Sequence, residues 1–299
     1  MGQIEEEMND LALIVLNYNS SDDTITCVRR LLEFQANYHI IVVDNQSTDD
    51  SLVKITSAIG KNENVDIIQS GRNGGYSAGN NYGINFAKRK YGIHYAAILN
   101  PDVLIPNVKV FTRLLGVLKR NESLAVVGAS VINAENEYNP NYSYWSIPSS
   151  KDIVLNHFLL NKRKIGSKNS PLIENGVIQV ECVAGCFFVA KIKALDDVNL
   201  LDENVFLYNE ENILGIKLKK AGYIEAVVLD TFYIHNHKHQ KQTNISLKKK
   251  INTTANGYKS RKYLCSKYYS KVYIPFLWFV ERLNKCYLLI SYFKNKITG

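Results

Sequence analysis

The stretch that decides the fold runs from residue 71 to residue 102 and reads GRNGGYSAGNNYGINFAKRKYGIHYAAILNPD. Its first part is a turn rich in glycine and asparagine, and glycine lets backbone amides come close to an anionic ligand. Its last part is the apolar run 95–99, which ends in Asn100-Pro101-Asp102. Open α/β sheets bind their ligands beyond the carboxyl ends of such strands. The stretch therefore predicts a nucleotide site with a metal ion beside it.

Short apolar runs on both sides of this stretch alternate with helix-compatible segments. The runs expected to form strands are 11–16, 39–44, 65–69, 94–99 and 124–128. This alternation is typical of a parallel sheet covered by helices. Residues 139–175 contain three prolines and few periodic apolar positions, and they predict a long irregular insertion. An insertion of this kind often shapes an acceptor site.

Composition and cysteine usage place the chain among intracellular globular proteins. The 299 residues are 46% hydrophobic, enough for one large domain or one and a half. The five cysteines are odd in number and widely spaced, so we expect reduced thiols, with Cys182 and Cys186 in the core. The first seven residues are acidic where a signal peptide is basic, and no apolar run has the length of a membrane span. We therefore expect a cytoplasmic protein.

The last 43 residues are basic and aromatic. Residues 257–299 hold nine Lys or Arg but a single acidic residue, Glu281, and eleven aromatic side chains are interleaved with them. This mixture favours a helical tail that associates with an anionic membrane surface. The alternative is a pair of helices that packs on the body with its lysines in solvent. Nucleic acid is not expected as a partner, because no recognition motif accompanies the charges.

Asp44 is predicted at the carboxyl end of a buried strand. A carboxylate there can accept hydrogen bonds from a base or a ribose. The alternative is an ordinary turn cap, a role that Ser47 and Asp49 could also supply.

Taken together, the motifs identify a family. The chain resembles an inverting glycosyltransferase of family 2 with the GT-A fold, in its bacterial branch that builds rhamnose-containing and other surface polysaccharides. The resemblance covers about residues 10–240 and is carried by Ile14 to Asn19, Val42 to Asn45 with Ser47 and Asp49, Asn73 to Asn81, Leu99 to Asp102, Gly185 to Phe188, and Phe206 to Glu211. It implies a nucleotide-binding half at about 10–130, an acceptor and catalytic half at about 131–240, and a helical membrane-associating tail at 241–299.

The resemblance implies a nucleoside diphosphate sugar as donor, linked to UDP or dTDP, and Mg²⁺ or Mn²⁺ as cofactor. The family's acidic pair reads Asn100-Pro101-Asp102 here, so metal binding transfers to Asp102 alone. His235 matches the family's later histidine best and His237 is the alternative; zinc catalysis is not expected, since its further ligands are not evident. The residues that the resemblance assigns to the nucleotide sugar are Asn17, Asn19, Asp44, Arg72, Asn73, Gly75, Asn80, Asn100 and Asp102.

Glu210 and Glu211 are the candidate catalytic bases. They open a predicted helix that ends before Gly222. Adjacent helical residues point about 100° apart, so we expect that the two cannot face one cleft equally and that one is preferred. Glu211 shares its side with Leu214 and Leu218 and is the better candidate. The family usually has Glu-Asp here, and a further acid often stands where this chain has Ile213.

The predicted fold is therefore α/β, a Rossmann-like GT-A fold with a mostly parallel central sheet. The predicted activity is sugar transfer to a hydroxyl of a lipid-linked cell-surface glycan precursor at the inner face of the cell membrane. A homo-oligomer is compatible with this prediction. The alternative is a catalytically silent nucleotide-sugar-binding or scaffold member of the same fold, suggested by Asn100 and Ile213. A nucleotide-binding oxidoreductase is discarded, because no glycine fingerprint follows the first strand.

Overall fold

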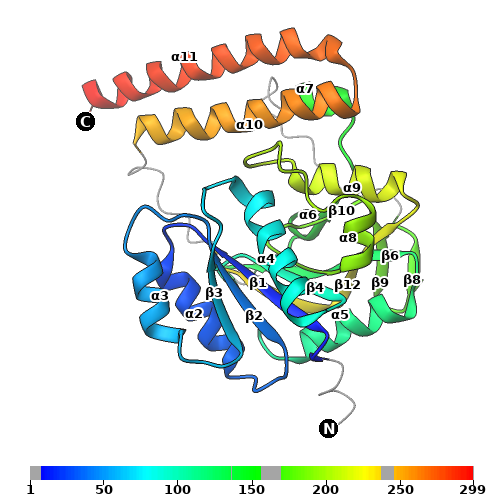
Figure 1. Ribbon diagram of the computed structural model, residues 1–299. Coiled ribbons are helices and arrows are strands. Elements are labelled where there is room, and N and C mark those ends of the chain that lie inside the picture. Colours follow the sequence, from blue (N-terminus) through cyan, green and yellow to red (C-terminus); the bar gives the residue numbers. More distant parts are fainter. Residues whose placement is uncertain (1–7, 136, 156–169, 237–245, 299) are drawn as a thin grey trace.

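The computed structural model describes residues 8–135, 137–155, 170–236 and 246–298. Within these ranges a mixed sheet of ten strands forms the centre of the molecule (Figure 1). Its order is β3-β2-β1-β4-β11-β6-β12-β9-β8, and β5 pairs with β12 outside this path. The strands are β1 Leu11–Asn17, β2 His39–Asp44, β3 Val65–Gln69, β4 Tyr95–Leu99, β5 Val103–Leu104, β6 Leu124–Asn133, β8 Leu172–Glu174, β9 Val177–Val180, β11 Phe187–Lys191 and β12 Ile224–His235.

The first four strands run parallel, and the pairing β6 with β12 is parallel as well. Strand β11 runs antiparallel between β4 and β6 and joins the two parallel parts. The α/β class and the mostly parallel centre predicted from the sequence are confirmed, and each of the five expected strands forms at its place. β6 continues to Asn133, five residues beyond its predicted end, because β12 pairs along that extension.

Helices cover both faces of the sheet and bury alternate side chains of the central strands. Leu11, Leu13 and Val15 of β1 pack under α2, α3 and α5, whereas Ala12 and Ile14 face α4, α8 and α9. A strand buried on both faces must be apolar throughout, which explains the unbroken hydrophobic runs. The helices are α2 Ser21–Leu32, α3 Ser51–Ile59, α4 Gly75–Tyr91, α5 Lys109–Arg120, α8 Ile192–Asp197 and α9 Glu210–Lys220.

The predicted insertion at 139–175 is largely irregular but contains short elements. They are α6 Pro140–Ser143, β7 Tyr144–Trp145, α7 Ser150–Leu155 and β8, and residues 156–169 lie outside the described part. β7 pairs with β10 Cys182–Val183 in a small second sheet. The insertion thus lies against β10, the strand that leads into the loop at Gly185.

The C-terminal tail forms a helical hairpin that lies on the body as a separate layer, at the top of Figure 1. It consists of α10 Leu247–Tyr268, the short 3-10 turn η2 Lys271–Tyr273, and α11 Ile274–Thr298. Tyr258 and Leu264 of α10 and Leu277 of α11 form a third core with Ile213 and Ile216 of α9. The hairpin is therefore packed on the catalytic half, as the alternative interpretation of the tail expected. Among the described helices, none combines the length and the apolar character that crossing a bilayer requires.

Candidate functional site

The loop before α9 is held in a strained conformation. Tyr208 and Asn209 both have left-handed backbones, with φ of +73° and +70°. For residues other than glycine such a conformation costs of the order of 1–3 kcal/mol, and it persists only where the surroundings impose it. This loop places Glu210 and Glu211 in the first turn of α9.

The glycine-rich stretch holds that loop in place. The Tyr76 amide donates a hydrogen bond to the Phe206 carbonyl over 3.2 Å. Gly75, with φ of +85°, lies so close that a Cβ atom there would be 2.1 Å from the Phe206 oxygen. The tyrosine hydroxyl of Tyr76 donates to the Gly185 carbonyl. The start of α4 is therefore a structural support for the candidate catalytic loop.

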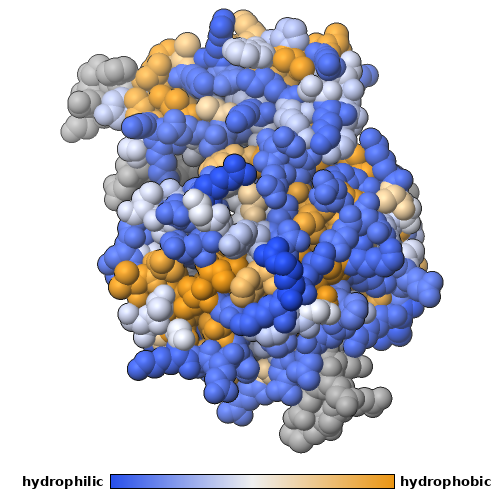
Figure 2. Space-filling view, viewed as in Figure 1, coloured by the Kyte–Doolittle hydropathy of each residue, from blue (hydrophilic) through white to orange (hydrophobic). Residues whose placement is uncertain are grey.

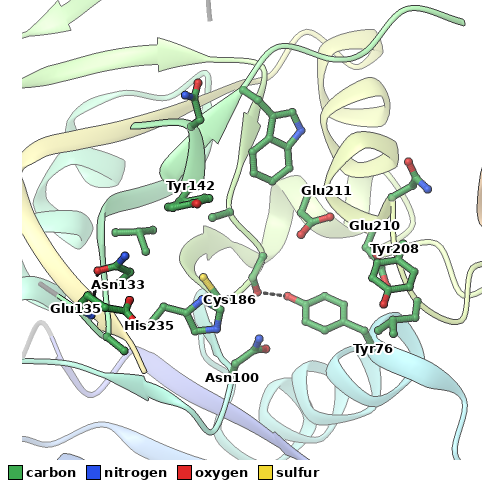
Figure 3. A pocket seen from close by; sticks show the side chains of 18 residues that line it. Tyr76, Asn100, Asn133, Glu135, Tyr142, Cys186, Tyr208, Glu210, Glu211 and His235 are labelled. Carbon is green, nitrogen blue, oxygen red and sulfur yellow. Dashed lines mark hydrogen bonds between the residues drawn. The ribbon is translucent and has the colours of Figure 1, made fainter. Parts of the chain in front are cut away.

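A cavity of about 710 Å³ opens beside this loop (Figure 3). Glu210 and Glu211 line one side, and Asn100, Cys186 and His235 line the other. Both side chains line the cavity at the amino end of α9, so the expected preference for Glu211 stays a prediction.

The two carboxyl groups share an environment that resists a double negative charge. Glu210 is buried, and burial together with the neighbouring Glu211 charge raises its pKa to about 8. Burial also raises the pKa of Glu211, but its own amide and that of Gly185 counteract this by hydrogen bonding. Two buried carboxyls that interact strongly lose their protons in separate steps. The pair therefore resists double ionisation, and Glu211, whose charge raises the pKa of Glu210, is the better candidate for the ionised member.

Asp102 and His235 come together through strand pairing. Val103 of β5 lies opposite His235 at the end of β12, and the Asn236 amide donates to the Asp102 carbonyl over 2.8 Å. This pairing brings His235 Nε2 to 3.3 Å from Asp102 Oδ2. Burial would lower the pKa of His235, but the Asp102 carboxylate and the Cys186 thiol raise it to about 10. His235 reaches the cavity directly, whereas Asp102 lies behind it.

Asp102, His235 and Asn100 suit a divalent cation that also binds water or substrate oxygens. A carboxylate and an imidazole in contact, with the Asn100 amide on the same cavity, supply two or three ligands. Within the described ranges, no group of three His, Cys, Asp or Glu side chains gathers to hold a metal alone. Mg²⁺ and Mn²⁺ sites commonly complete their shell with water and substrate phosphates. His237, the alternative ligand, lies outside the described residues.

The predicted nucleotide residues meet at the carboxyl edge of β1, β2 and β3. Asn17 donates to the Asp44 carboxylate over 2.9 Å, and Asn19 exchanges hydrogen bonds with Thr48. Asn73 accepts from the Gly75 amide and from Asn45. The structure thus brings five of the nine predicted residues into one hydrogen-bonded edge.

Two members of that set are already engaged within the protein. The Asp44 carboxylate is fully buried and accepts from Asn17, Ser47 and Gln69, so the capping role is present. Asn80 is fully buried inside α4, where its amide donates to the Tyr76 carbonyl. Arg72, in contrast, is exposed at the turn. Contacts of these residues with a nucleotide stay predictions.

Three cavity residues were missed by the sequence interpretation. Cys186 lies in the core as expected, but it also lines the cavity, where its sulfur is 3.0 Å from the Tyr233 hydroxyl. Trp145 reaches the cavity from β7 and donates its indole N–H to Asn212 over 2.9 Å. Tyr76 was quoted only as part of the glycine-rich turn. The aromatic type of Tyr76, in a stretch of glycine and small polar residues, was the available signal.

The sequence of this chain matches one family model and two characterised glycosyltransferases. The family model described as "Glycosyl transferase family 2" matches residues 12–186, so it includes Asp102 and ends before α9. The chain is similar to the low-salt glycan biosynthesis hexosyltransferase Agl10 of Haloferax volcanii, with 25% identity over 68% of this chain and 60% of that protein. It is also similar to the rhamnosyltransferase WbbL of Escherichia coli K12, with 25% identity over 70% of this chain and 77% of that protein. The match thus spans less than two thirds of Agl10.

Two solved structures share the fold. The mannosyltransferase PcManGT from Pyrobaculum calidifontis, in complex with GDP-Man and Mn²⁺, superimposes with a TM-score of 0.56 at 13% identity, over 90% of this chain and 68% of that one. GalNAc-T7 with UDP, GalNAc and Mn²⁺ gives a TM-score of 0.57 at 14% identity, over 86% and 50%. Both likenesses concern the GT-A fold alone. The family model, which matches more than half of the sequence, assigns the chain to glycosyl transferase family 2.

Proposed function

We propose that this protein is an inverting glycosyltransferase, which moves a sugar from a nucleoside diphosphate donor to a hydroxyl group of a glycan precursor. The observation that carries the proposal is a single cavity with the Glu210 and Glu211 pair on one side and Asn100 and His235 on the other, where His235 contacts Asp102. The first side suits a proton acceptor, and the second suits the anionic leaving group.

The reaction follows from these two sides. Glu211 takes the proton from the acceptor hydroxyl while that oxygen attacks the anomeric carbon of the donor sugar. The new carbon–oxygen bond forms on the face opposite the bond that breaks, so the anomeric centre inverts, and the nucleoside diphosphate leaves with the electron pair. Glu210, held neutral by burial, keeps the charge on its neighbour. Tyr76 and Trp145 border the space left for the sugars.

A divalent cation would be held by Asp102 and His235, with Asn100 beside them. When bound, Mg²⁺ or Mn²⁺ supplies positive charge to the donor diphosphate. Asp102 and His235 already share one charge-assisted contact, so a cation must displace the proton of the imidazole. The presence of Mn²⁺ in both solved relatives supports this part of the proposal.

The donor and acceptor classes rest on the relatives. Agl10 is named a hexosyltransferase of glycan biosynthesis and WbbL a rhamnosyltransferase, which supports a hexose or deoxyhexose as the transferred sugar. We propose UDP or dTDP as its carrier. We extend the proposal to a lipid-linked precursor of a cell-surface polysaccharide as acceptor, at the inner face of the membrane.

A panel of nucleotide sugars tests the proposal. Donor at about 100 times its Kd should stabilise the protein by about 2.7 kcal/mol, visible as a raised thermal midpoint in the presence of Mn²⁺. The Asp102→Ala variant should lose the Mn²⁺-dependent part of that shift and of donor hydrolysis. Asp196→Ala, which removes an exposed carboxylate that pairs with Lys88, is the matched control. Full Mn²⁺-stimulated hydrolysis in the Asp102 variant would exclude the metal role, and the absence of a shift with every donor would exclude the transferase.

A catalytically silent member of the same fold is the second candidate. Asn100 stands where the resemblance expects an acid, and one carboxylate binds metal less strongly than two. A silent protein would bind donor yet neither hydrolyse nor transfer it, whatever the substitution at Glu211.

The outer face of α11 supports a proposed association with an anionic membrane. Its exposed apolar residues recur every three or four positions and therefore share one side of the helix. They are Phe276, Phe279, Leu283, Tyr287 and Ile290, and we call this set the α11 stripe. Lys271 and Arg282 are exposed beside it. Figure 2 displays apolar residues interspersed with hydrophilic ones over the hairpin at the top of the molecule. This combination is typical of helices that lie in the plane of a membrane surface.

A further inference from the structure

A second pocket lies between the hairpin and the catalytic loop. Its volume is about 370 Å³, and Arg261 and Thr254 of α10, Asn284 of α11 and Tyr208 contribute to its walls. Tyr208 also lines the main cavity, next to Glu210. Tyr208 therefore borders both this pocket and the side of the cavity where an acceptor hydroxyl must lie.

Arg261 is the charged group of this second pocket and is held in a fixed position. Its guanidinium lies over the ring of Tyr258, 5.0 Å from the centroid. A Cβ atom at Gly257 would lie only 3.2 Å from its Nη1 atom and 3.5 Å from the Tyr208 ring. Glycine at 257 thus leaves the space that lets the guanidinium lie against α10 beside Tyr208.

No carboxylate compensates this charge in the described part of the hairpin. From residue 246 to 292 the sequence holds one acid, Glu281, and its two oxygens bind Lys262 and Lys285 over 2.7 and 2.6 Å. Burial lowers the pKa of Arg261, and only the tyrosines 258 and 208 act in the other direction. Arginine nevertheless stays protonated in proteins. A partly buried cation without a counterion favours an anionic ligand.

The hydrogen-bond donors that line this second pocket favour a phosphate group as the ligand. The guanidinium fork matches two phosphate oxygens, and the hydroxyls of Thr253 and Thr254 and the Asn284 amide are further donors. The donor diphosphate belongs on the opposite side of the cavity, at Asn100, Asp102 and His235. A phosphate beside Tyr208 is therefore placed on the acceptor side.

We propose that the second pocket, which contains Arg261, binds the phosphate group of a lipid-linked acceptor. The sugar of the acceptor then reaches Glu210 and Glu211 past Tyr208. This proposal rests on the proposed transferase function. The source of the phosphate is argued from α11, which contributes Asn284 to the pocket and carries the α11 stripe on its outer side. A lipid whose chain lies in the membrane beside α11 can place its phosphate in this pocket.

Vesicle binding tests the assignment without requiring turnover. Phosphatidylcholine vesicles that contain a polyprenyl diphosphate are compared with vesicles given the same surface charge by phosphatidylglycerol. Wild-type protein should prefer the diphosphate vesicles by about tenfold, as expected for one charge-assisted contact pair. Arg261→Gln should abolish this preference, and Gly257→Ala, which crowds the guanidinium, should reduce it. Arg282→Gln, which removes an exposed arginine of α11, should lower binding to both vesicles equally.

Several outcomes would overturn the proposal. It fails when Arg261→Gln, with an unchanged thermal midpoint, keeps the preference for diphosphate vesicles. It also fails when wild-type protein has no such preference but binds inorganic pyrophosphate through Arg261, because the ligand is then a free phosphate. A donor hydrolysis assay distinguishes failure of the acceptor site from failure of the proposed transferase function. If wild-type protein does not hydrolyse any donor, the transferase function is rejected. If it hydrolyses donor but has no preference for the diphosphate vesicles, only the acceptor site is rejected.

Discussion

Glu210 and Glu211 are neighbours in sequence and differ in what surrounds their carboxyl groups. Glu211 accepts backbone hydrogen bonds at the Gly185 loop, and Glu210 lies buried with one carboxyl oxygen that no described group satisfies. Glu210 also accepts backbone hydrogen bonds, from its own amide and that of Tyr208, but the neighbouring Glu211 charge adds to burial in raising its pKa and favours its neutral form. At the scale of the residue, the two acids are therefore suited to different roles in one site.

This difference predicts the effect of isosteric substitution. Glu211→Gln keeps the packing at Gly185 but cannot accept a proton, so transfer should fall by about 10²–10⁴-fold while donor affinity is retained. Single-turnover transfer and donor titration of the same samples measure the two quantities. Glu203→Gln, which alters an exposed glutamate ahead of the loop, should leave both unchanged. Transfer within a few fold of wild type in the Glu211 variant would remove Glu211 as the base.

The hairpin is held to the body by one acidic residue and a small apolar core. Asp202 accepts hydrogen bonds from Tyr263, Lys267 and Tyr268 of α10. Burial alone would raise its pKa, but these bonds and those from Asn204 hold the pKa well below its usual range. Removal of the hairpin would uncover this cluster and the core around Ile213, so deletion is a poor test of membrane binding. Substitution on the exposed side of α11 avoids that problem.

The α11 stripe yields a prediction at the scale of the element. Phe279 and Ile290 are 56% and 67% exposed, so serine at both positions should leave the folded state intact. Each large apolar side chain contributes about 1.5–3 kcal/mol on burial, and binding to phosphatidylglycerol vesicles should therefore fall at least tenfold. Leu172→Ser, at an equally exposed residue of β8, is the control. Light scattering without vesicles identifies the competing explanation: a wild-type dimer that the double variant dissociates would make the stripe an interface between two copies.

For the molecule as a whole, the glutamate pair links stability to pH. The folded state binds a proton at Glu210 with a pKa of about 8, against an ordinary value of 4.5. Between these values the folded state holds more protons than the unfolded state, so this group's contribution to stability falls as the pH rises.

Glu210→Gln should therefore gain stability relative to wild type as the pH rises from about 5 to 8, with a slope of at most about 1.4 kcal/mol per pH unit, and the difference should level off above that range. Urea unfolding at a series of pH values measures it. Glu122→Gln, an exposed glutamate, corrects for the general effect of removing a charge. A difference that is constant with pH would mean that Glu210 is ionised in the folded protein throughout.

The sequence by itself determined the order and type of the elements. Runs such as residues 40–43 are apolar throughout because the strand is buried on both faces, and the pattern of such runs identified the α/β fold. Motifs within one segment were equally accessible: residues 71–81, Asn100 to Asp102, and the acidic pair at the start of α9 were named without coordinates. These features depend on neighbours within one turn or one strand, which a sequence pattern reports directly.

Only the tertiary structure decided how those motifs meet. The contact of Asp102 with His235 depends on the pairing of β5 with β12, across more than 130 residues of chain, and no local pattern specifies that register. Both glutamates face the cavity because the left-handed pair Tyr208 and Asn209 and the close packing at Gly75 fix the loop before α9. The placement of Arg261 beside Tyr208 likewise requires the hairpin to fold back onto α9. Each of these depends on packing between distant segments, which composition and periodicity do not encode.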